Sequence, residues 1–190
     1  MITASAISSI ESMFEHSVRE NSRVGAEDDC VITRLPGLIS AVQPGNRKLV
    51  VLNISSYIFR VVVVAAFDSD ESTVAHLAKI LRIPDAKLEG QALLDGYAEF
   101  VNMICGTVNR KLCAEFRHAG MSTPFFLDEA CATYLAMINP AATGSLEVVI
   151  NDSAHFRLTV CTCVARDVEL DFDIVPFEQE DEPTGELELF

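Results

Sequence analysis

The chain has 190 residues, enough for one folded domain with a substantial hydrophobic core. Its 28 acidic and 14 basic residues give a formal net charge of −14, which repels phosphate backbones and anionic lipid surfaces, so we expect no nucleic-acid partner. The longest apolar run, Tyr57 to Phe67, is interrupted by Arg60 and is far shorter than the roughly 20 residues of a membrane-spanning helix. We therefore expect no membrane insertion.

The N-terminus shows no secretory signal, so we expect a cytoplasmic protein. The cysteines show no CxxC motif and no paired Cys/His spacing of the kind that zinc requires, and in a reducing compartment they are expected to pack as buried thiols. Cys161 and Cys163 alone would place two sulfurs on one face of a strand, which leaves a weak alternative as a redox or metal site. The six cysteines are Cys30, Cys105, Cys113, Cys131, Cys161 and Cys163.

The first third of the chain predicts a helix followed by strands. Ala4 to Val18 has apolar residues at helical spacing, and Thr3 or Ser5 can cap its start. Cys30 to Val42 is expected to be a strand broken at Pro36-Gly37. Two β-branched runs, Lys48–Ile54 and Tyr57–Phe67, are too apolar for a strand with one exposed face and are predicted as a hairpin in the middle of a sheet.

The middle of the chain predicts two helices. Acidic residues from Asp68 to Glu71 supply caps and favourable charge for a helix that begins near Ser72, and Pro84 is expected to end it. Leu88 to Phe116 then has the length and the apolar period of a long helix.

The last third predicts mainly strands. Met121–Asp128 is expected at an edge of the sheet, and Glu129–Ile138 is ambiguous between a short helix and a strand. Leu146–Ile150 and His155–Val164 are predicted to pair as antiparallel strands, and the alternation within Val168–Ile174 predicts another strand with an acidic face. The composition turns strongly acidic after this, so we divide the chain into a domain over residues 1–177 and a flexible tail over 178–190.

The long helix carries one polar ridge. Asp95, Glu99, Asn102, Gly106 and Asn109 follow each other in steps of three or four and therefore share a helix face. A solvated surface is the usual explanation of such a stripe. Here, however, Asn and Gly are poor helix formers, and a carboxylate and a carboxamide stand side by side, one able to pair with a cation and the other able to orient water. We interpret them as half of an active site whose other half lies on a partner.

These residues carry a family resemblance. The segment DGYAEFVNMICG, with Asp95, Glu99 and Asn102 spaced D-x-x-x-E-x-x-N and with Pro124 after the helix, resembles the signature of the CheC/CheX/FliY phosphatases of bacterial chemotaxis. The single copy and the NMICG segment look most like CheX. The resemblance implies an α+β fold of the CheC/CheX type, in which an antiparallel or mixed sheet packs with the long signature helix and two shorter helices.

The resemblance also implies an activity, namely hydrolysis of the phosphoaspartate on a CheY-type response-regulator receiver domain. It implies that Asn102 orients the attacking water and that Glu99 pairs with the receiver's active-site Lys. It implies no cofactor bound by this chain, since the receiver brings Mg²⁺, and it implies a homodimer. We expect Asp95 to help orientation or docking, and Tyr97, Met103 and Gly106 to contact the partner.

A second hypothesis belongs to another class of protein. A non-catalytic CheX-like module would bind a receiver domain without accelerating hydrolysis, as a scaffold in two-component signalling. The sequence leaves this alternative open.

Overall fold

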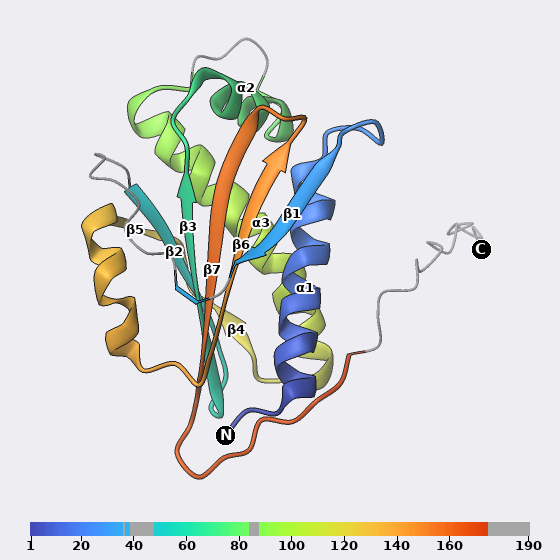
Figure 1. Cartoon of the computed structure of the whole chain (residues 1–190), viewed down its shortest axis with the longest axis vertical. Coiled ribbons are helices and arrows are strands. Elements are labelled where there is room, and N and C mark those ends of the chain that lie inside the picture. Colours follow the sequence, from blue (N-terminus) through green and yellow to red (C-terminus); the bar gives the residue numbers. More distant parts are fainter. Residues whose placement is uncertain (36, 39–47, 84–87, 175–190) are drawn as a thin grey trace, which may run out of the picture.

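A computed structural model describes residues 1–35, 37–38, 48–83 and 88–174 (Figure 1). In these ranges the helices are α1 (Ala4–Ser22), α2 (Glu71–Ile80), α3 (Gly90–Glu115) and the 3-10 helix η1 (Glu129–Ile138). The strands are β1 (Cys30–Leu35), β2 (Lys48–Ser55), β3 (Phe59–Phe67), β4 (Gly120–Met121), β5 (Phe125–Asp128), β6 (Ala142–Ile150) and β7 (Ala154–Val164). No helix among the described residues has both the length and the hydropathy needed to cross a membrane.

Two hairpins build the centre of the sheet. β2 pairs with β3, β6 pairs with β7, and β3 and β7 join the hairpins side by side, every pairing being antiparallel. β1 extends the sheet beyond β6, and β4 and β5 pair with successive parts of β2 on the opposite side. The predicted hairpin and the predicted pair after residue 145 are therefore confirmed, and the most apolar strands lie inside the sheet.

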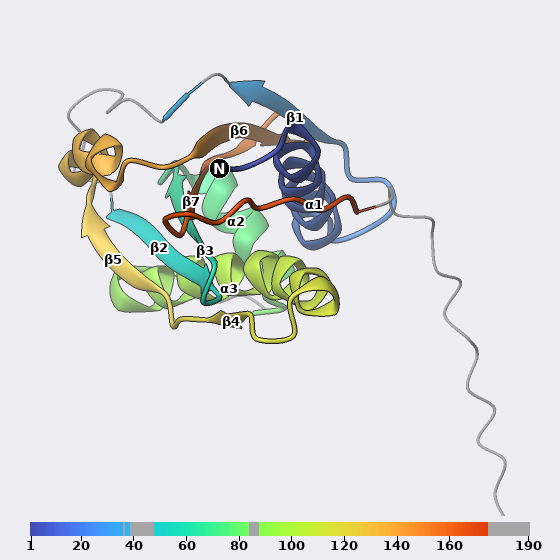
Figure 2. The same cartoon turned by 90° about the horizontal axis from the view of Figure 1, so that it is seen from below.

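The two faces of the sheet pack against different helices. Alternate residues of β2 and β3, such as Val50 and Val63, face the main core with α1, α2 and α3. Their neighbours, such as Val51 and Val64, face a smaller apolar cluster that includes Leu135 of η1. The period-2 side-chain alternation of a strand thus separates the two layers. Figure 2 shows α1 and α3 together on one side of the sheet.

One expectation is wrong, one open alternative is decided, and one expectation stays untested. The ambiguous segment Glu129–Ile138 is a 3-10 helix. The first strand ends at Leu35, and the expected continuation over residues 39–42 lies outside the described residues, as do Pro84 and the tail 178–190. Val168–Ile174 is not a strand: only Leu170 forms a bridge, with Ile2. The predicted burial of alternate side chains is found at Leu170 and Phe172. These side chains pack beside α1 and α3, however, and the segment does not join the sheet.

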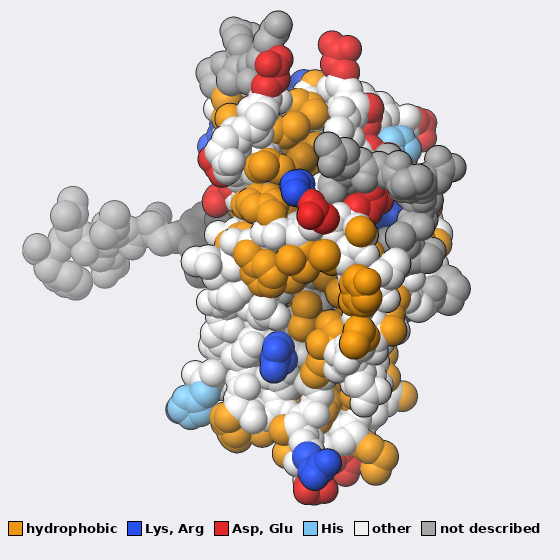
Figure 3. Space-filling model, turned by 90° about the vertical axis from the view of Figure 1, so that its left-hand side faces the viewer, with side chains coloured by type: hydrophobic (Ala, Val, Ile, Leu, Met, Phe, Trp, Pro, Cys, Tyr) orange, Lys and Arg blue, Asp and Glu red, His pale blue; other side chains and the backbone are white. Residues whose placement is uncertain are grey.

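Apolar side chains remain exposed at one edge of the sheet. Figure 3 shows hydrophobic side chains gathered on the face that η1 and β5 occupy. The largest exposures there are those of Met137 (79 %) and Tyr134 (64 %) on η1, while Phe125 and Leu127 of β5 are exposed at 41 % and 36 %. Patches of this kind mark surfaces that contact other molecules.

Gly96 sets the distance between α2 and α3. A Cβ at this position would lie 3.2 Å from Leu81 Cδ1 and 3.3 Å from Leu77 Cδ2. We therefore expect Gly96→Val to overpack the contact and to lower the free energy of unfolding by about 1–3 kcal/mol, measured by urea denaturation. Gly106→Val is the matched control on the same helix, because a Cβ there meets no described atom within 4 Å. Equal destabilisation by the two variants would contradict this assignment.

Asp70 caps α2 with its carboxylate. Burial opposes its ionisation, but hydrogen bonds from Ser72 and Thr73 outweigh this effect and hold the pKa of Asp70 well below its usual range. A depressed pKa in the folded state stabilises the fold above the unfolded-state pKa of about 3.9 and ceases to do so as the pH falls through the folded-state pKa.

We therefore expect Asp70→Ala to cost about 1 kcal/mol at pH 7, and the difference from wild type to shrink as the pH falls below about 4. Urea denaturation of wild type and variant at pH 7 and at a pH below about 4 measures this difference in the free energy of unfolding. Asp70→Asn is the control, since asparagine caps a helix without titrating. A pH-independent cost of Asp70→Ala would show that the charge plays no part.

Candidate functional site

The helix that carries the polar ridge is fixed by aromatic packing. Tyr97 stacks on Phe67 of β3 with ring centroids 4.2 Å apart, and Phe100 meets Phe156 of β7 edge to face at 5.3 Å. Phe67 also contacts Phe100 and Phe156, so four rings form one cluster beneath the first half of α3. Aromatic pairs of this geometry add to the free energy gained by burying the rings. The cluster holds α3 in one orientation on the sheet.

Hydrogen bonds from α1 hold the second half of α3. The hydroxyl of Ser17, which is fully buried, donates to the carbonyl oxygen of Ile104 at 2.7 Å. The amide of Asn21 donates to the hydroxyl of Thr107 at 3.3 Å. Bonds of this kind are directional, and they fix both the rotation of α3 about its axis and its position along α1. The face of α3 that points outward is therefore determined by contacts on its inner side.

Glu99 and Asn102 lie on that outward face. Glu99 is exposed and Asn102 is half-buried, and the side chain of neither residue has a hydrogen bond or an ion pair with any described residue. Positions i and i+3 of a regular helix are neighbours on its surface. The structure thus places a carboxylate and a carboxamide side by side on a rigid helix. Because neither has a partner within the described chain, both can bind groups of another molecule.

The other ridge positions fall into two groups. Asp95 is exposed and accepts a hydrogen bond from Gln91 at 2.8 Å, while Met103 is half-buried. Gly106 has open space where a side chain would be. Asn109, the last ridge position, is not simply solvated surface, because its side-chain oxygen is buried and has no hydrogen-bond partner among the described residues. The usable ridge therefore runs from Asp95 to Gly106.

Tyr97 is a core residue, which corrects the expectation that it contacts a partner. Its exposed fraction is 6 %, its ring lies against Phe67, and its hydroxyl donates to the carbonyl oxygen of Asp68 at 3.4 Å. Burial raises its pKa. The residue positions α3, and it offers no surface to a docking protein.

A shallow apolar hollow adjoins the acidic end of the ridge, which the sequence patterns did not reveal. It has a volume of about 450 Å³ and lies between the end of α2 and the start of α3. Leu81, Ile83 and Ala92 line it, and Asp95 and Glu99 stand at its border. In the sequence, Gly96 was the residue that could have indicated the nearby contact between α2 and α3, because a glycine inside a helix often marks a close approach of another element.

The surroundings of Cys161 and Cys163 do not favour the redox alternative. Burial raises the pKa of Cys161 to about 11 and that of Cys105 to about 12, and it also raises the pKa of Cys163. The reactive form of a cysteine is the thiolate, so these thiols are poor nucleophiles at neutral pH. All six are free thiols, and the described residues include no group of three or more His, Cys, Asp and Glu side chains placed to hold a metal ion.

Comparison with known proteins identifies the fold by structure alone. No protein-family model and no curated protein matches the sequence. The CheX–CheY–BeF3–Mg²⁺ complex from Borrelia burgdorferi contains a chain that superposes with a TM-score of 0.57 at 11 % identity, covering 83 % of this chain and 97 % of that one.

Two other structures agree. A putative chemotaxis protein from Desulfovibrio vulgaris Hildenborough has a TM-score of 0.55 at 14 % identity, with 84 % and 99 % covered. A CheC-like superfamily protein from Shewanella sp. PV-4 has a TM-score of 0.51 at 8 % identity, with 84 % and 98 % covered. The antiparallel sheet and the long helix on it confirm the predicted fold class: this chain has the α+β fold of the CheX and CheC-like chemotaxis proteins.

Proposed function

We propose that this protein dephosphorylates the phosphoaspartate of a CheY-type receiver domain. The observation that carries the proposal is the placement of Glu99 and Asn102, adjacent on an outward helix face and without partners in the described chain. A polar pair held by a rigid scaffold and left unsatisfied suits a site that is completed by another protein. The Borrelia burgdorferi CheX with the same fold was solved in complex with CheY, which supports a receiver as the partner.

In the proposed mechanism, each side chain has one task. The carboxamide of Asn102 accepts one hydrogen bond from a water molecule and donates another to the phosphoryl oxygens, which directs the water at phosphorus. The carboxylate of Glu99 pairs with the receiver's active-site Lys and so fixes the docked geometry. The receiver's own Mg²⁺ supplies charge neutralisation at the phosphoryl group. Hydrolysis of this type depends on positioning and electrostatics, so a residue that never bonds covalently can supply much of the rate.

Docking must rely on contacts near the ridge, because the formal net charge of −14 gives no long-range attraction for an acidic partner. We assign Asp95 and Met103 to this contact, together with Gly106, whose missing side chain leaves room for the partner's surface. The hollow beside Asp95 and Glu99 adds apolar area to the same contact.

Removal of the Asn102 carboxamide tests the catalytic role. We expect Asn102→Ala to slow phosphate release from a phosphorylated receiver by about a hundredfold or more, because the water loses its orienting group. Release is measured with the receiver in excess, and binding of the receiver is measured separately.

Asn109→Ala is the matched control, with the same change two turns further along α3, and it should retain activity. Equal phosphate release by wild type and Asn102→Ala would remove Asn102 from the mechanism. Wild-type binding of the receiver without any change in its phosphate lifetime would favour the non-catalytic scaffold module instead.

Gly106 tests the docking geometry. We expect Gly106→Val to leave the fold intact, since the new side chain meets no described atom within 4 Å, but to weaken receiver binding at least tenfold by occupying the space of the partner. Titration of wild type and variant with the receiver, together with urea denaturation of both, separates the two effects. Unchanged affinity would show that Gly106 lies outside the contact.

The homodimer implied by the resemblance is also part of the proposal. The exposed apolar side chains of η1 and β5, above all Met137 and Tyr134, are the observation that supports a further protein contact.

A further inference from the structure

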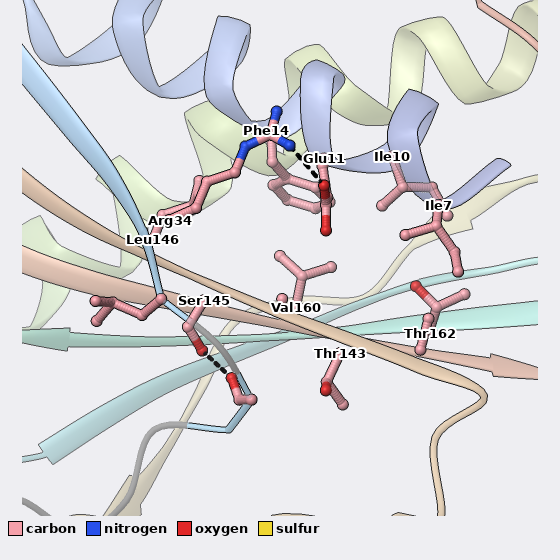
Figure 4. A pocket seen from close by; sticks show the side chains of 14 residues that line it. Ile7, Ile10, Glu11, Phe14, Arg34, Thr143, Ser145, Leu146, Val160 and Thr162 are labelled. Atoms are coloured by element: carbon pink, nitrogen blue, oxygen red, sulfur yellow. Dashed lines mark hydrogen bonds and ion pairs between the residues drawn. The ribbon is translucent and has the colours of Figure 1, made fainter. Parts of the chain in front are cut away.

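A second site lies away from the ridge, between α1 and the β6–β7 half of the sheet. It is a cavity of about 150 Å³, and no residue that lines it belongs to α3. Its apolar wall comes from Ile7, Ile10 and Phe14 of α1 and from Val160 of β7 (Figure 4). An apolar cavity of about this volume in another protein holds benzene, so a molecule with one ring fits here.

The cavity exists because β6 begins with small residues. Leu146 of β6 is part of the main core beneath the helices, and by strand alternation Ala142 and Gly144 face the same side. These two positions carry almost no side chain, so the space between them and α1 is left unfilled. A Cβ on Gly144 would lie 3.4 Å from Oε1 of Glu11. The Glu11 carboxylate therefore lies directly beside these small residues at the cavity.

An ion-pair cluster stands at the rim. Arg34 of β1 donates from Nη1 to Oε2 of Glu11 at 2.8 Å and from Nε to Oε1 of Glu15. One guanidinium thus faces two carboxylates, and the cluster carries a net charge of −1. Oε1 of Glu11 receives no donor from the described residues, and Figure 4 shows this carboxylate directed into the cavity. Within the described part of the chain, the cavity therefore offers an anionic oxygen that no donor occupies.

Thr162 supplies a second polar group. Its exposed fraction is 3 %, and its hydroxyl has no hydrogen bond to any residue that the structure describes. Figure 4 shows the hydroxyl turned toward the cavity. A hydroxyl group both donates and accepts hydrogen bonds, so this side chain can pair with a polar group of a bound molecule.

We propose that this cavity binds a small organic cation, with a ring-sized apolar body on the wall formed by α1 and Val160, an ammonium or amidinium group at Glu11, and a polar substituent or a water at Thr162. The charge of the rim selects a cation, because an anion would face two carboxylates, and among the described residues Arg34 is the cation that pairs with them and it already serves both. The side chain of Glu11 is 30 % exposed, so water screens this attraction only in part.

The test uses the full chain and benzylamine as the probe, with binding followed by NMR titration. A ligand of this size should bind with a dissociation constant on the order of millimolar. Glu11→Gln should weaken binding at least about tenfold, as expected for loss of a charged hydrogen-bond acceptor. Ala142→Leu, which fills the cavity and keeps Glu11, should abolish it, and melting curves establish that both variants are folded.

Glu20→Gln is the matched control, because it removes the same charge from the exposed side of the same helix. Benzyl alcohol, which has the same ring without the cation, should bind more weakly than benzylamine. The proposal is overturned if the two probes bind alike, if Glu11→Gln and Glu20→Gln have equal effects, if Ala142→Leu still binds, or if wild type shows no saturable binding.

Discussion

The packing of α3 on the antiparallel sheet is the interaction on which the other features depend. Its buried apolar side chains face the sheet and the neighbouring helices, and the aromatic cluster around Phe67 fixes their arrangement. Because stability is supplied on this side, the outward side can carry residues that contribute nothing to folding. Glu99 and Asn102 are of that kind: a carboxylate and a carboxamide without partners in the described chain are tolerated only because the helix does not need them.

Two glycines on α3 illustrate the division between folding and function. Gly96 is surrounded, with Leu77 and Leu81 within 3.3 Å of the place of a side chain, and its absence of a Cβ lets α2 approach. Gly106 faces open space, so no contact within the described chain accounts for it, although a glycine inside a helix costs about 1 kcal/mol relative to alanine. Packing explains the first glycine, whereas the second requires a reason outside the described chain, and a docked partner provides one.

Sequence patterns predicted the parts of this structure that depend on periodicity. The helix over 88–116, the hairpin of β2 and β3 and the pair β6–β7 follow from alternation and turn residues. The pattern of buried residues within an element was predictable, but the segment against which they pack was not. Val168–Ile174 alternates like a strand, yet its buried side chains pack beside helices. Tyr97 was expected on the surface beside the ridge, but its ring stacks on Phe67 in the core. Contacts between distant segments have no local signal, which is also why the cavity beside α1 was not foreseen.

The two carboxylates Glu99 and Glu11 show how one residue type serves two kinds of recognition. Glu99 stands exposed on a helix, where water screens its charge, so its pairing with a cation is worth little until a partner excludes the water. Excluding this water requires a large and closely fitting interface, which a partner protein can provide. Glu11 is held by Arg34 and is already partly shielded, so a cation that enters its cavity meets an oriented acceptor without the help of an extensive interface. Preorganisation lowers the entropy lost on binding and makes a small ligand sufficient. The two sites thus differ in how far the carboxylate is already shielded from water before the ligand binds.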